Sequence, residues 1–278
     1  MRVDLHIHST ASDGRWTPDQ LVQQVRQTGI DLFAVADHDS MANVSAVEQL
    51  VRHNTDGLCF IRAAEVSTTL DGNLIHIVAY GVDPENADLQ QILEENEQTL
   101  SSVDYQSIQK LIEANYPVSL AEYERYENDV TRGGWKALNY MIDKGICHGV
   151  KDFFGRLFVG DMALVYPTFA DPAEAVRTIH RAGGIAIWAH PGESIRKAEA
   201  DVLHWALDLG LDGLECYSPY HDRAMIERCL HFCRHHDLLI TAGSDCHGGF
   251  AGRKLGMPQA YIDDLNLGPL LERVICGY

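Results

Sequence analysis

The sequence lacks two features that would place the protein in a membrane or outside the cell. No run of about 18 uninterrupted apolar residues occurs, so no segment is expected to span a bilayer. The chain enters an ordered apolar pattern within a few residues, which leaves no room for a signal peptide. The seven cysteines form no CxxC pair and are odd in number, which argues against a disulfide framework. We therefore expect a cytoplasmic protein with reduced, mostly buried thiols and no membrane partner.

Positive charge is also scarce. Lys and Arg number 22 against 40 Asp and Glu, which gives a formal net charge of −18. A surface of this kind repels the phosphate backbone, so we expect no stable nucleic-acid partner. Bound metal ions are the largest local charges in a site, and they still allow an acidic protein to bind a small phosphorylated substrate.

Short apolar runs are abundant, and they suit an α/β protein. The content of apolar residues is 46% in 278 residues, enough for a real core. Runs rich in Val, Ile, Leu and Phe alternate with segments of helical periodicity, which is typical of βα units and of a parallel sheet or barrel. We predict strands near 2–8, 31–36, 58–64, 185–189, 212–216 and 238–243.

Turn and cap signals refine this plan. Thr17 and Asp171 each precede a proline and a helical pattern, so each is predicted to cap a helix. Asp71-Gly72 lies between two apolar runs and predicts a two-residue hairpin, which would make 74–80 antiparallel to the preceding strand. The barrel is therefore expected to be irregular.

The strand pattern stops from 86 to 166. This stretch is polar, acidic and favourable to helix. We predict a barrel formed by 1–85 and 167–278, with 86–166 as an inserted helical subdomain that serves as a substrate cap.

Histidines and carboxylates gather where the predicted strands end. His6 and His8 lie two apart on one strand and hence on one face, where two imidazoles can bind one ion. An isolated pair of this kind is as often a polar strand face, but four further strands end in the same chemistry. In barrels and open parallel sheets the functional face lies beyond the carboxyl ends of the strands. These endings are Asp37-His38-Asp39, Glu65, His190-Pro191-Gly192 and Asp245-Cys246-His247.

Two further candidates depend on their surroundings. A lone histidine in an apolar strand, such as His76, is usually a core residue. With Asp71-Gly72 as the turn, however, Ser67 pairs with His76, and Glu65 lies diagonal to His76 on the same face, about 7 Å away. Asp13 follows the first strand in a loop and would alone be an ordinary turn residue. We include both as candidate ligands.

Taken in order, these motifs resemble those of the PHP family, named after polymerases and histidinol phosphatases. The resemblance covers roughly 1–80 and 170–260 and implies a distorted (β/α)7, TIM-like barrel. It also implies a metal centre with Glu65 bridging two ions. One ion would bind His6, His8, Glu65 and Asp245, a second Glu65, His76 and His190, and a third Asp13, His38 and His247.

The ligand chemistry itself favours phosphate. Six imidazoles and three carboxylates with no thiolate suit Mn²⁺, Fe²⁺ or Zn²⁺ better than Ca²⁺. Two or three divalent ions would leave a positive centre and could hold a hydroxide that attacks phosphorus, so no side chain is assigned as the nucleophile. Cys246 should point to the opposite strand face, which favours packing. Glu215 and Tyr217 are candidates for second-shell or substrate contacts.

A phosphatase commonly adds Arg or Lys to bind phosphate oxygens. The candidates in this chain are Arg132, Lys136, Arg156 and Arg177, with Arg253 and Lys254 following the last motif. Surface charge is the alternative for each of them. Tyr105, Tyr123, Tyr126 and Trp135 can stack on a base or form the core of the insert.

The leading hypothesis is a metal-dependent phosphoesterase acting on a small metabolite or nucleotide, with nucleoside 3′,5′-bisphosphates and cyclic phosphates as candidate substrates. The alternatives are an exonuclease on short oligonucleotides, a histidinol-phosphate phosphatase and a non-catalytic PHP accessory module. An amidohydrolase reaction is also possible in principle, because the same metal chemistry attacks carbonyls.

Overall fold

The computed structural model describes residues 1–53, 57–195 and 202–277. The strands are β1 (Arg2–Ile7), β2 (Leu32–Val35), β3 (Cys59–Leu70), β4 (Asn73–Tyr80), β5 (Ile185–Trp188), β6 (Gly213–Tyr217), β7 (Leu239–Ala242), β8 (Ala260–Tyr261) and β9 (Ile275–Cys276). The α-helices are α1 (Pro18–Thr28), α2 (Val44–Arg52), α3 (Ala87–Glu113), α4 (Leu120–Arg125), α5 (Lys136–Asp143), α6 (Val150–Asp152), α7 (Pro172–Arg181), α8 (Pro191–Ile195), α9 (Trp205–Asp208) and α10 (Arg223–His235). Short 3₁₀ or π turns are η1 (Val130–Arg132), η2 (Phe153–Leu157), η3 (Gly160–Met162), η4 (Ile262–Asp264) and η5 (Gly268–Arg273).

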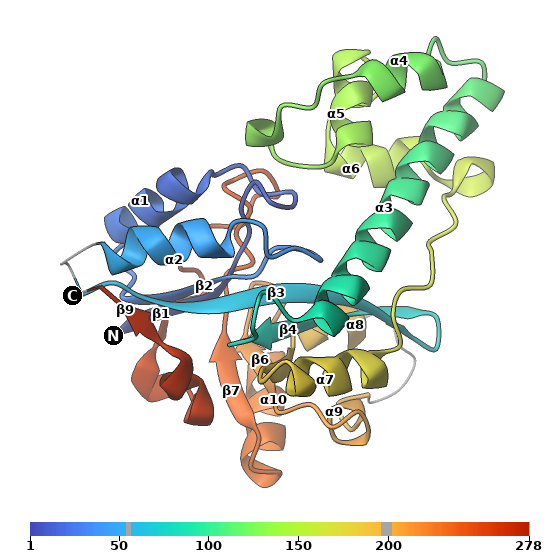
Figure 1. The fold of residues 1–278 in the computed structure, drawn as a ribbon. Coiled ribbons are helices and arrows are strands. Elements are labelled where there is room, and N and C mark those ends of the chain that lie inside the picture. The colour runs from blue at the N-terminus through green and yellow to red at the C-terminus, as the bar shows by residue number, and fades with distance from the viewer. Residues whose placement is uncertain (54–56, 196–201, 278) are drawn as a thin grey trace.

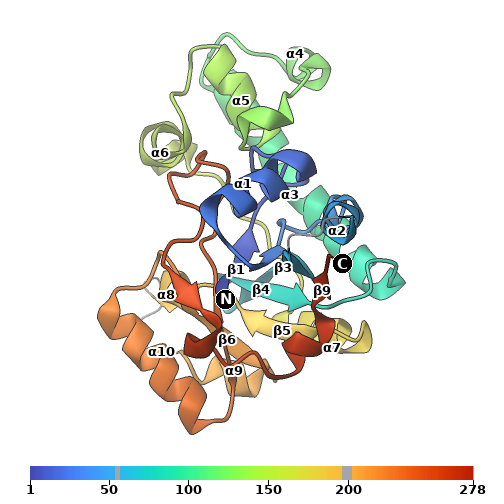
Figure 2. The same ribbon diagram turned by 90° about the vertical axis from the view of Figure 1, so that its left-hand side faces the viewer.

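The strands form a nearly closed barrel (Figures 1 and 2). Their order is β7-β6-β5-β4-β3-β2-β1-β8, and β9 pairs with β3. Strand β4 is antiparallel to both β3 and β5, whereas β1–β2–β3 and β5–β6–β7 are parallel. The row comes back on itself where Ile7 bridges Cys246 and the His8 N–H donates to the Cys246 carbonyl at 2.9 Å. The predicted distorted barrel is confirmed.

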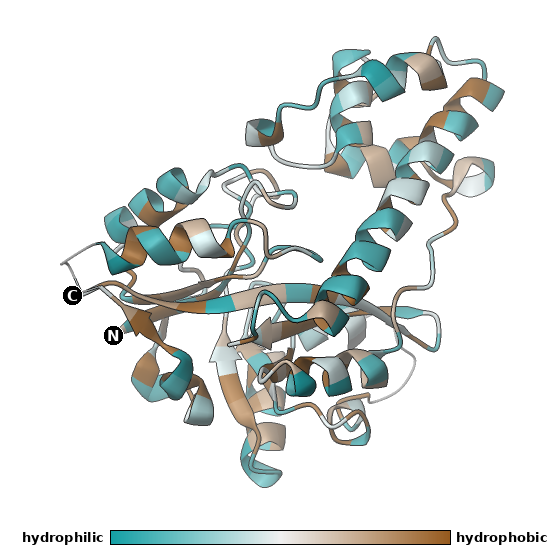
Figure 3. Ribbon diagram, in the orientation of Figure 1, coloured by the Kyte–Doolittle hydropathy of each residue, from teal (hydrophilic) through white to brown (hydrophobic). Residues whose placement is uncertain are grey.

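Two apolar layers hold the barrel together. The inner layer contains strand residues such as Leu5, Ala34 and Ile187. The outer layer joins the opposite strand faces to the surrounding helices, for example through Val25 of α1 and Ile179 of α7. Figure 3 shows the same division, with brown gathered in the strands and more teal on the outer helical turns. Burying both strand faces explains why the strands are nearly continuous apolar runs.

The predicted turn and cap signals form as expected. Strands β3 and β4 make a hairpin in which Thr69 pairs with Leu74 and Ser67 with His76. Thr17 caps α1 through a capping box with Gln20, and the Asp171 side chain accepts the Glu174 N–H of α7. These signals are local in sequence, and the structure confirms all three.

Helices α3 to α6 lie within the stretch where the strand pattern stops. Helix α3 has 27 residues and leads away from the barrel, with α4, α5 and α6 gathered at its far end (Figure 1). These helices share an apolar cluster that includes Ile108, Tyr123 and Met141. The division at 86 and 166 and the role of a cap remain predictions. No described helix combines the length and apolarity needed to cross a membrane.

One expectation about cysteine is wrong. Cys59 and Cys276 form a disulfide across 217 positions of sequence. They are register partners in the antiparallel pair β3–β9, which brings their Cα atoms to 4.2 Å. Counting cysteines cannot reveal a pair that only the return of the C-terminus creates. The other five cysteines are free and buried, as expected.

Candidate metal centre

The nine predicted ligands converge at one end of the barrel. His6, Glu65 and His76 lie within β1, β3 and β4, and the others follow strand ends. Six of the nine are at most 3% exposed, whereas Asp13, His38 and His76 are half-buried. Their convergence was expected because the carboxyl ends of the parallel strands meet on one face. Strand β4 reaches this face although it is antiparallel, because the hairpin places His76 near its start.

A bulge in β1 turns the first two histidines inward. Val3 and Leu5 face the inner apolar layer, whereas Ile7 faces the outer one. Asp4 pairs with Phe33 and Ile7 with Val35, so β1 uses one extra residue over this stretch. An extra residue reverses the alternation of side chains. His6 and His8 consequently both point into the barrel.

Glu65 lies at the centre of the cluster. Its Oε2 atom is 3.1 Å from His6 Nε2 and 3.0 Å from His38 Nδ1. Its Oε1 atom is 3.2 Å from His76 Nδ1 and 2.9 Å from His190 Nε2. His8 Nε2 also lies 3.4 Å from Oε2, so one buried carboxylate contacts five imidazoles from four different chain segments.

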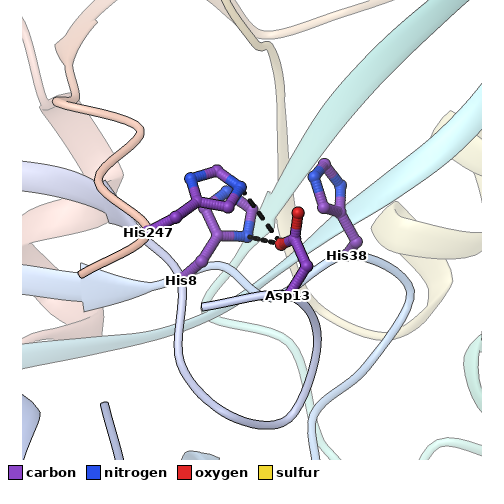
Figure 4. Close-up of side chains that lie close together, drawn as sticks. All are labelled: His8, Asp13, His38 and His247. Carbon is purple, nitrogen blue, oxygen red and sulfur yellow. Dashed lines mark ion pairs between the residues drawn. The ribbon is translucent and has the colours of Figure 1, made fainter. Parts of the chain in front are cut away.

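The other two carboxylates lie on the side of His8. Asp245 Oδ1 is 2.9 Å from His8 Nε2 and 3.8 Å from His6 Nε2. Asp13 Oδ1 is 3.1 Å from His247 Nε2 and 3.9 Å from His8 Nδ1, and Figure 4 shows it beside these two rings, with His38 on its other side. His8 thus presents one ring nitrogen to each aspartate.

Three groups of these residues have ligand atoms close enough to share an ion. They are His6, His8, Glu65 and Asp245; His8, Asp13, His38 and His247; and His38, Glu65 and His76. The first reproduces a predicted set, and the second adds His8 to a predicted set. The third contains His38 where His190 was expected, although His190 also contacts Glu65. Neighbouring groups share His8, Glu65 or His38, which is how a multinuclear centre is built.

Buried oxygen atoms test whether a cation fits. Asp13 Oδ1, Glu65 Oε2 and Asp245 Oδ1 are buried and accept no hydrogen bond, although each lies near ring nitrogens. An oxygen in that position costs free energy unless something positive neutralises it. Imidazole and carboxylate donors suit a divalent transition metal. The donor set and the unsatisfied oxygens therefore both fit divalent ions.

The electrostatics of the cluster show strong coupling between these groups. Burial lowers the pKa of His6, but the charges of Glu65 and Glu215 outweigh it and raise that pKa to about 10. Burial also lowers the pKa of His38, but the charge of Glu65 outweighs burial and raises that pKa to about 9. Burial and the charge of His247 hold the pKa of His8 well below its usual value. Protons and metal ions compete for the same atoms, so metal affinity should rise with pH.

Three buried aspartates beside the ligands hold the ligand loops, a role that the sequence analysis did not assign. Asp4 accepts backbone N–H groups of Ser244 at 2.9 Å and Gly256 at 2.8 Å. Asp37 accepts the Ser9 N–H at 2.7 Å and the Ser12 hydroxyl at 2.6 Å. Burial raises the pKa of each. The signal available in the sequence was their position within two residues of a histidine.

Asp39 completes this set from the other side of His38. It accepts the Ser67 N–H at 2.9 Å and the Asn96 amide at 2.8 Å. Because Asn96 lies in α3, this bond links the long helix to the His38 loop. Burial also raises the pKa of Asp39.

Glu215, which the sequence suggested as a partner of a ligand or a substrate contact, lies against His6. Its Oε2 atom is 2.8 Å from His6 Nδ1, on the ring edge opposite Glu65. A Cβ at Gly243 would lie 2.2 Å from His6 Cβ and 2.8 Å from Glu215 Oε2. Only glycine leaves room for this pair. A carboxylate behind a metal-binding imidazole fixes its tautomer and orientation.

The four predicted substrate contacts pair with other groups. Arg132 binds Asp143 at 2.8 Å, Arg156 binds Asp152 through two nitrogens, and Arg177 binds Glu174 at 2.7 Å. Lys136 donates to the Glu124 carbonyl at 3.3 Å. Their role in substrate binding remains a prediction.

The guanidinium beside the cluster belongs to Arg253, and it binds Asp245. The Tyr220 hydroxyl donates to the same carboxylate at 2.9 Å. In the sequence, Arg253 is marked only by its place after the last motif, and no pattern singles out Tyr220. Cys246 is buried, and its thiol contacts the Arg253 carbonyl at 3.6 Å, in agreement with a packing role.

Known proteins resemble this chain along most of its length. A family model described as "PHP domain" matches residues 4–181. A 5′-3′ exoribonuclease of Haemophilus influenzae is 30% identical over 95% of this chain and 96% of that protein. A 3′,5′-nucleoside bisphosphate phosphatase of Chromobacterium violaceum is 26% identical over 91% of this chain and 90% of that protein. A structure from Bifidobacterium adolescentis, assigned as a metal-dependent phosphoesterase, matches with a TM-score of 0.80 and 26% identity, covering 94% and 93% of the two chains.

Proposed function

This chain belongs to the PHP domain family and is a hydrolase of phosphate esters, and from that premise we propose that it hydrolyses the 3′ phosphate ester of a nucleotide bearing a 5′ phosphate. The observation that carries the proposal is the cluster of nine ligands with its three buried, unsatisfied oxygens. Two or three divalent ions held there would outweigh three carboxylates and attract a phosphoryl group.

The ions would supply Lewis acidity and an activated water. The chain supplies the rest. Glu65 would bridge neighbouring ions, since its two oxygens face different imidazoles. Glu215 orients His6, and Tyr220 orients Asp245. Six of the nine candidate ligands are buried, which limits the screening of these charges by bulk water.

Nucleotide chemistry connects the two curated relatives. A nucleoside 3′,5′-bisphosphate has a 5′ phosphate and a 3′ phosphate monoester. The 5′ end of a phosphorylated RNA has the same unit with a diester at the 3′ position. A site that recognises this unit can accept either molecule. We propose the bisphosphate as the main substrate, because the net charge of −18 disfavours a long polyanion.

A second candidate function is exonucleolytic cleavage of short RNA. It is favoured by the 30% identity to the Haemophilus influenzae exoribonuclease over nearly the whole chain. Cyclic phosphates and histidinol phosphate remain candidates from the sequence, without a comparable observation.

The test is turnover by protein of known metal content, reconstituted with Mn²⁺. Substrates are a nucleoside 3′,5′-bisphosphate, a 5′-phosphorylated RNA of a few nucleotides, a cyclic phosphate, a simple monophosphate and histidinol phosphate. We expect phosphate release from the bisphosphate to exceed all others, to stop with chelator and to return with Mn²⁺. Faster release of mononucleotides from RNA would favour the second candidate. No turnover of any ester at full metal loading would contradict the proposal.

A further inference from the structure

We propose that Arg253 binds the phosphoryl group of the substrate at the rim of the metal centre. This inference deepens the proposed function and rests on it. The substrate class is therefore a phosphate ester whose nonbridging oxygens contact a guanidinium as well as the ions.

The two carboxylate oxygens of Asp245 have different partners. Its Oδ1 atom faces His8 at 2.9 Å and accepts no hydrogen bond. Its Oδ2 atom accepts the Tyr220 hydroxyl at 2.9 Å and contacts Arg253. One oxygen is therefore directed to the ion site and the other to the guanidinium. Asp245 therefore lies between Arg253 and the candidate ion site.

Arg253 has N–H donors beyond the one nitrogen that contacts Asp245. A guanidinium carries five N–H donors in a rigid plane, and NH1 is the nitrogen that contacts Asp245. The side chain is 24% exposed, so part of it faces solvent, whereas Asp245 is 3% exposed. A planar group at such a rim matches two phosphate oxygens at once.

The Arg253 side chain is already held in place in the structure without substrate. The guanidinium carbon lies 5.1 Å from the centre of the Tyr220 ring, and Tyr220 in turn packs on His190 at 4.9 Å between ring centroids. The backbone is held by the Cys246 thiol at the Arg253 carbonyl and by Asp4 at the Gly256 N–H. Little side-chain freedom is left to lose on binding.

Charge also favours a phosphoryl group as the partner of Arg253 in the metal-loaded protein. With a metal ion bound, Asp245 would share its negative charge between the ion and the guanidinium, so metal loading would weaken the ion pair between Asp245 and Arg253. A phosphoryl group carries up to two negative charges and is then the better partner. By comparison, Arg177 is 59% exposed and forms its ion pair with Glu174 on its own helix.

The experiment compares Arg253→Lys and Arg253→Gln with wild type, each checked for fold by circular dichroism. Arg223→Gln is the matched control, because Arg223 is 92% exposed and forms an ion pair with Glu227 of its own helix, α10. Three quantities are measured: bound metal, the dissociation constant of inorganic phosphate for the metal-loaded protein, and KM and kcat for the preferred ester.

We expect Arg253→Gln to weaken phosphate binding and raise KM by roughly 10- to 100-fold, as for loss of charge-assisted hydrogen bonds. Arg253→Lys keeps the positive charge but lacks the planar pair of N–H donors, so its phosphate affinity and KM should lie between those of Arg253→Gln and wild type. The bound metal of both Arg253 variants should equal that of wild type, and Arg223→Gln should match wild type in all of the measured quantities. A phosphate dissociation constant within twofold of wild type in both variants overturns the inference.

A second outcome also overturns it. If the variants lose metal and excess Mn²⁺ restores normal KM, Arg253 only positions Asp245. Failure of the proposed function looks different, because wild type would then release no phosphate from any ester. The phosphate-binding measurement would still decide whether Arg253 contacts a phosphoryl group.

Discussion

Glu65 and Glu215 are both buried acids that contact His6, but they stand on opposite edges of its ring. Glu65 also contacts His38, His76 and His190. Glu215 is placed behind the ring, at Nδ1. At the scale of single residues, this difference separates a candidate ligand from a residue that orients one.

Replacing each acid with glutamine should show that difference. Glu65→Gln puts a neutral amide at the centre of two ligand groups, and we expect metal affinity to fall by more than about 100-fold. Glu215→Gln disturbs only the orientation of His6 and should cost roughly 10- to 100-fold, the usual effect of a partner behind a ligand. Metal retained after dialysis at fixed free Mn²⁺ measures both.

Glu227→Gln is the control for charge, since Glu227 is 63% exposed on α10 and pairs with Arg223. If Glu65→Gln retained metal as wild type does, the bridging role would be wrong. Equal losses in the two variants would contradict the distinction between them.

At the scale of elements, Asp104 joins three helices of the segment between β4 and β5. It lies in α3 and accepts the Tyr123 hydroxyl of α4 at 3.0 Å and the Ala137 N–H of α5 at 3.2 Å. Helix α5 begins after Trp135 without a side-chain cap of its own. The orphan N–H groups of its first turn are therefore satisfied in part by another helix.

The stability of this junction should depend on pH. Burial raises the pKa of Asp104 to about 6, above the value of 3.8 that applies to the unfolded chain. The unfolded chain therefore loses this proton first as pH rises. The stability contributed by Asp104 is full below about pH 4, declines up to about pH 6 and is then constant. We expect a decline of about 3 kcal/mol.

Urea unfolding of wild type and Asp104→Asn at pH 4 to 7 isolates this effect. As pH rises, the free energy of unfolding of Asp104→Asn should increase relative to that of wild type, because asparagine does not titrate. Asp129→Asn is the control of opposite sign, because hydrogen bonds from Thr131 lower the pKa of Asp129. A difference between wild type and Asp104→Asn that does not vary with pH would contradict the prediction.

At the scale of the whole molecule, the helical segment contacts the loops that carry candidate ligands. The Gly134 N–H donates to the Asp13 carbonyl at 2.8 Å. A Cβ at Gly134 would lie 2.6 Å from Phe250 Cζ, and Phe250 follows His247 by three residues. The same segment contacts the first loop through Arg15, whose Nε donates to the Thr131 carbonyl at 3.4 Å. Both loops carry ligands of the group shown in Figure 4.

Gly134→Ala should therefore weaken ion binding at that group. The added carbon meets Phe250, so the Asp13 and His247 loops must shift, and we expect about a 10-fold loss of affinity for one ion. Gly145→Ala is the matched control, because Gly145 has the same kind of backbone (φ +68° against +74°) but open space around its Cβ. Metal titration followed by calorimetry measures the result. Equal behaviour of the two variants would show that the segment does not support the site.

The sequence alone determined the local structure and the ligand types. Helix caps at Thr17 and Asp171, the hairpin at Asp71-Gly72 and the ends of most strands follow from residues within a few positions of one another. The candidate ligands were also readable, because imidazoles and carboxylates at successive strand ends must meet where those ends meet.

Only the tertiary structure decided which of these groups touch. The β1 bulge that turns His6 inward, the sharing of His8 and His38 between groups, and the place of Arg253 on Asp245 arise from packing between distant segments. The Cys59–Cys276 pair has the same origin, 217 positions apart. Side-chain types and local periodicity are properties of neighbours in sequence, whereas distances of 3 Å between strands depend on register, bulges and closure of the barrel.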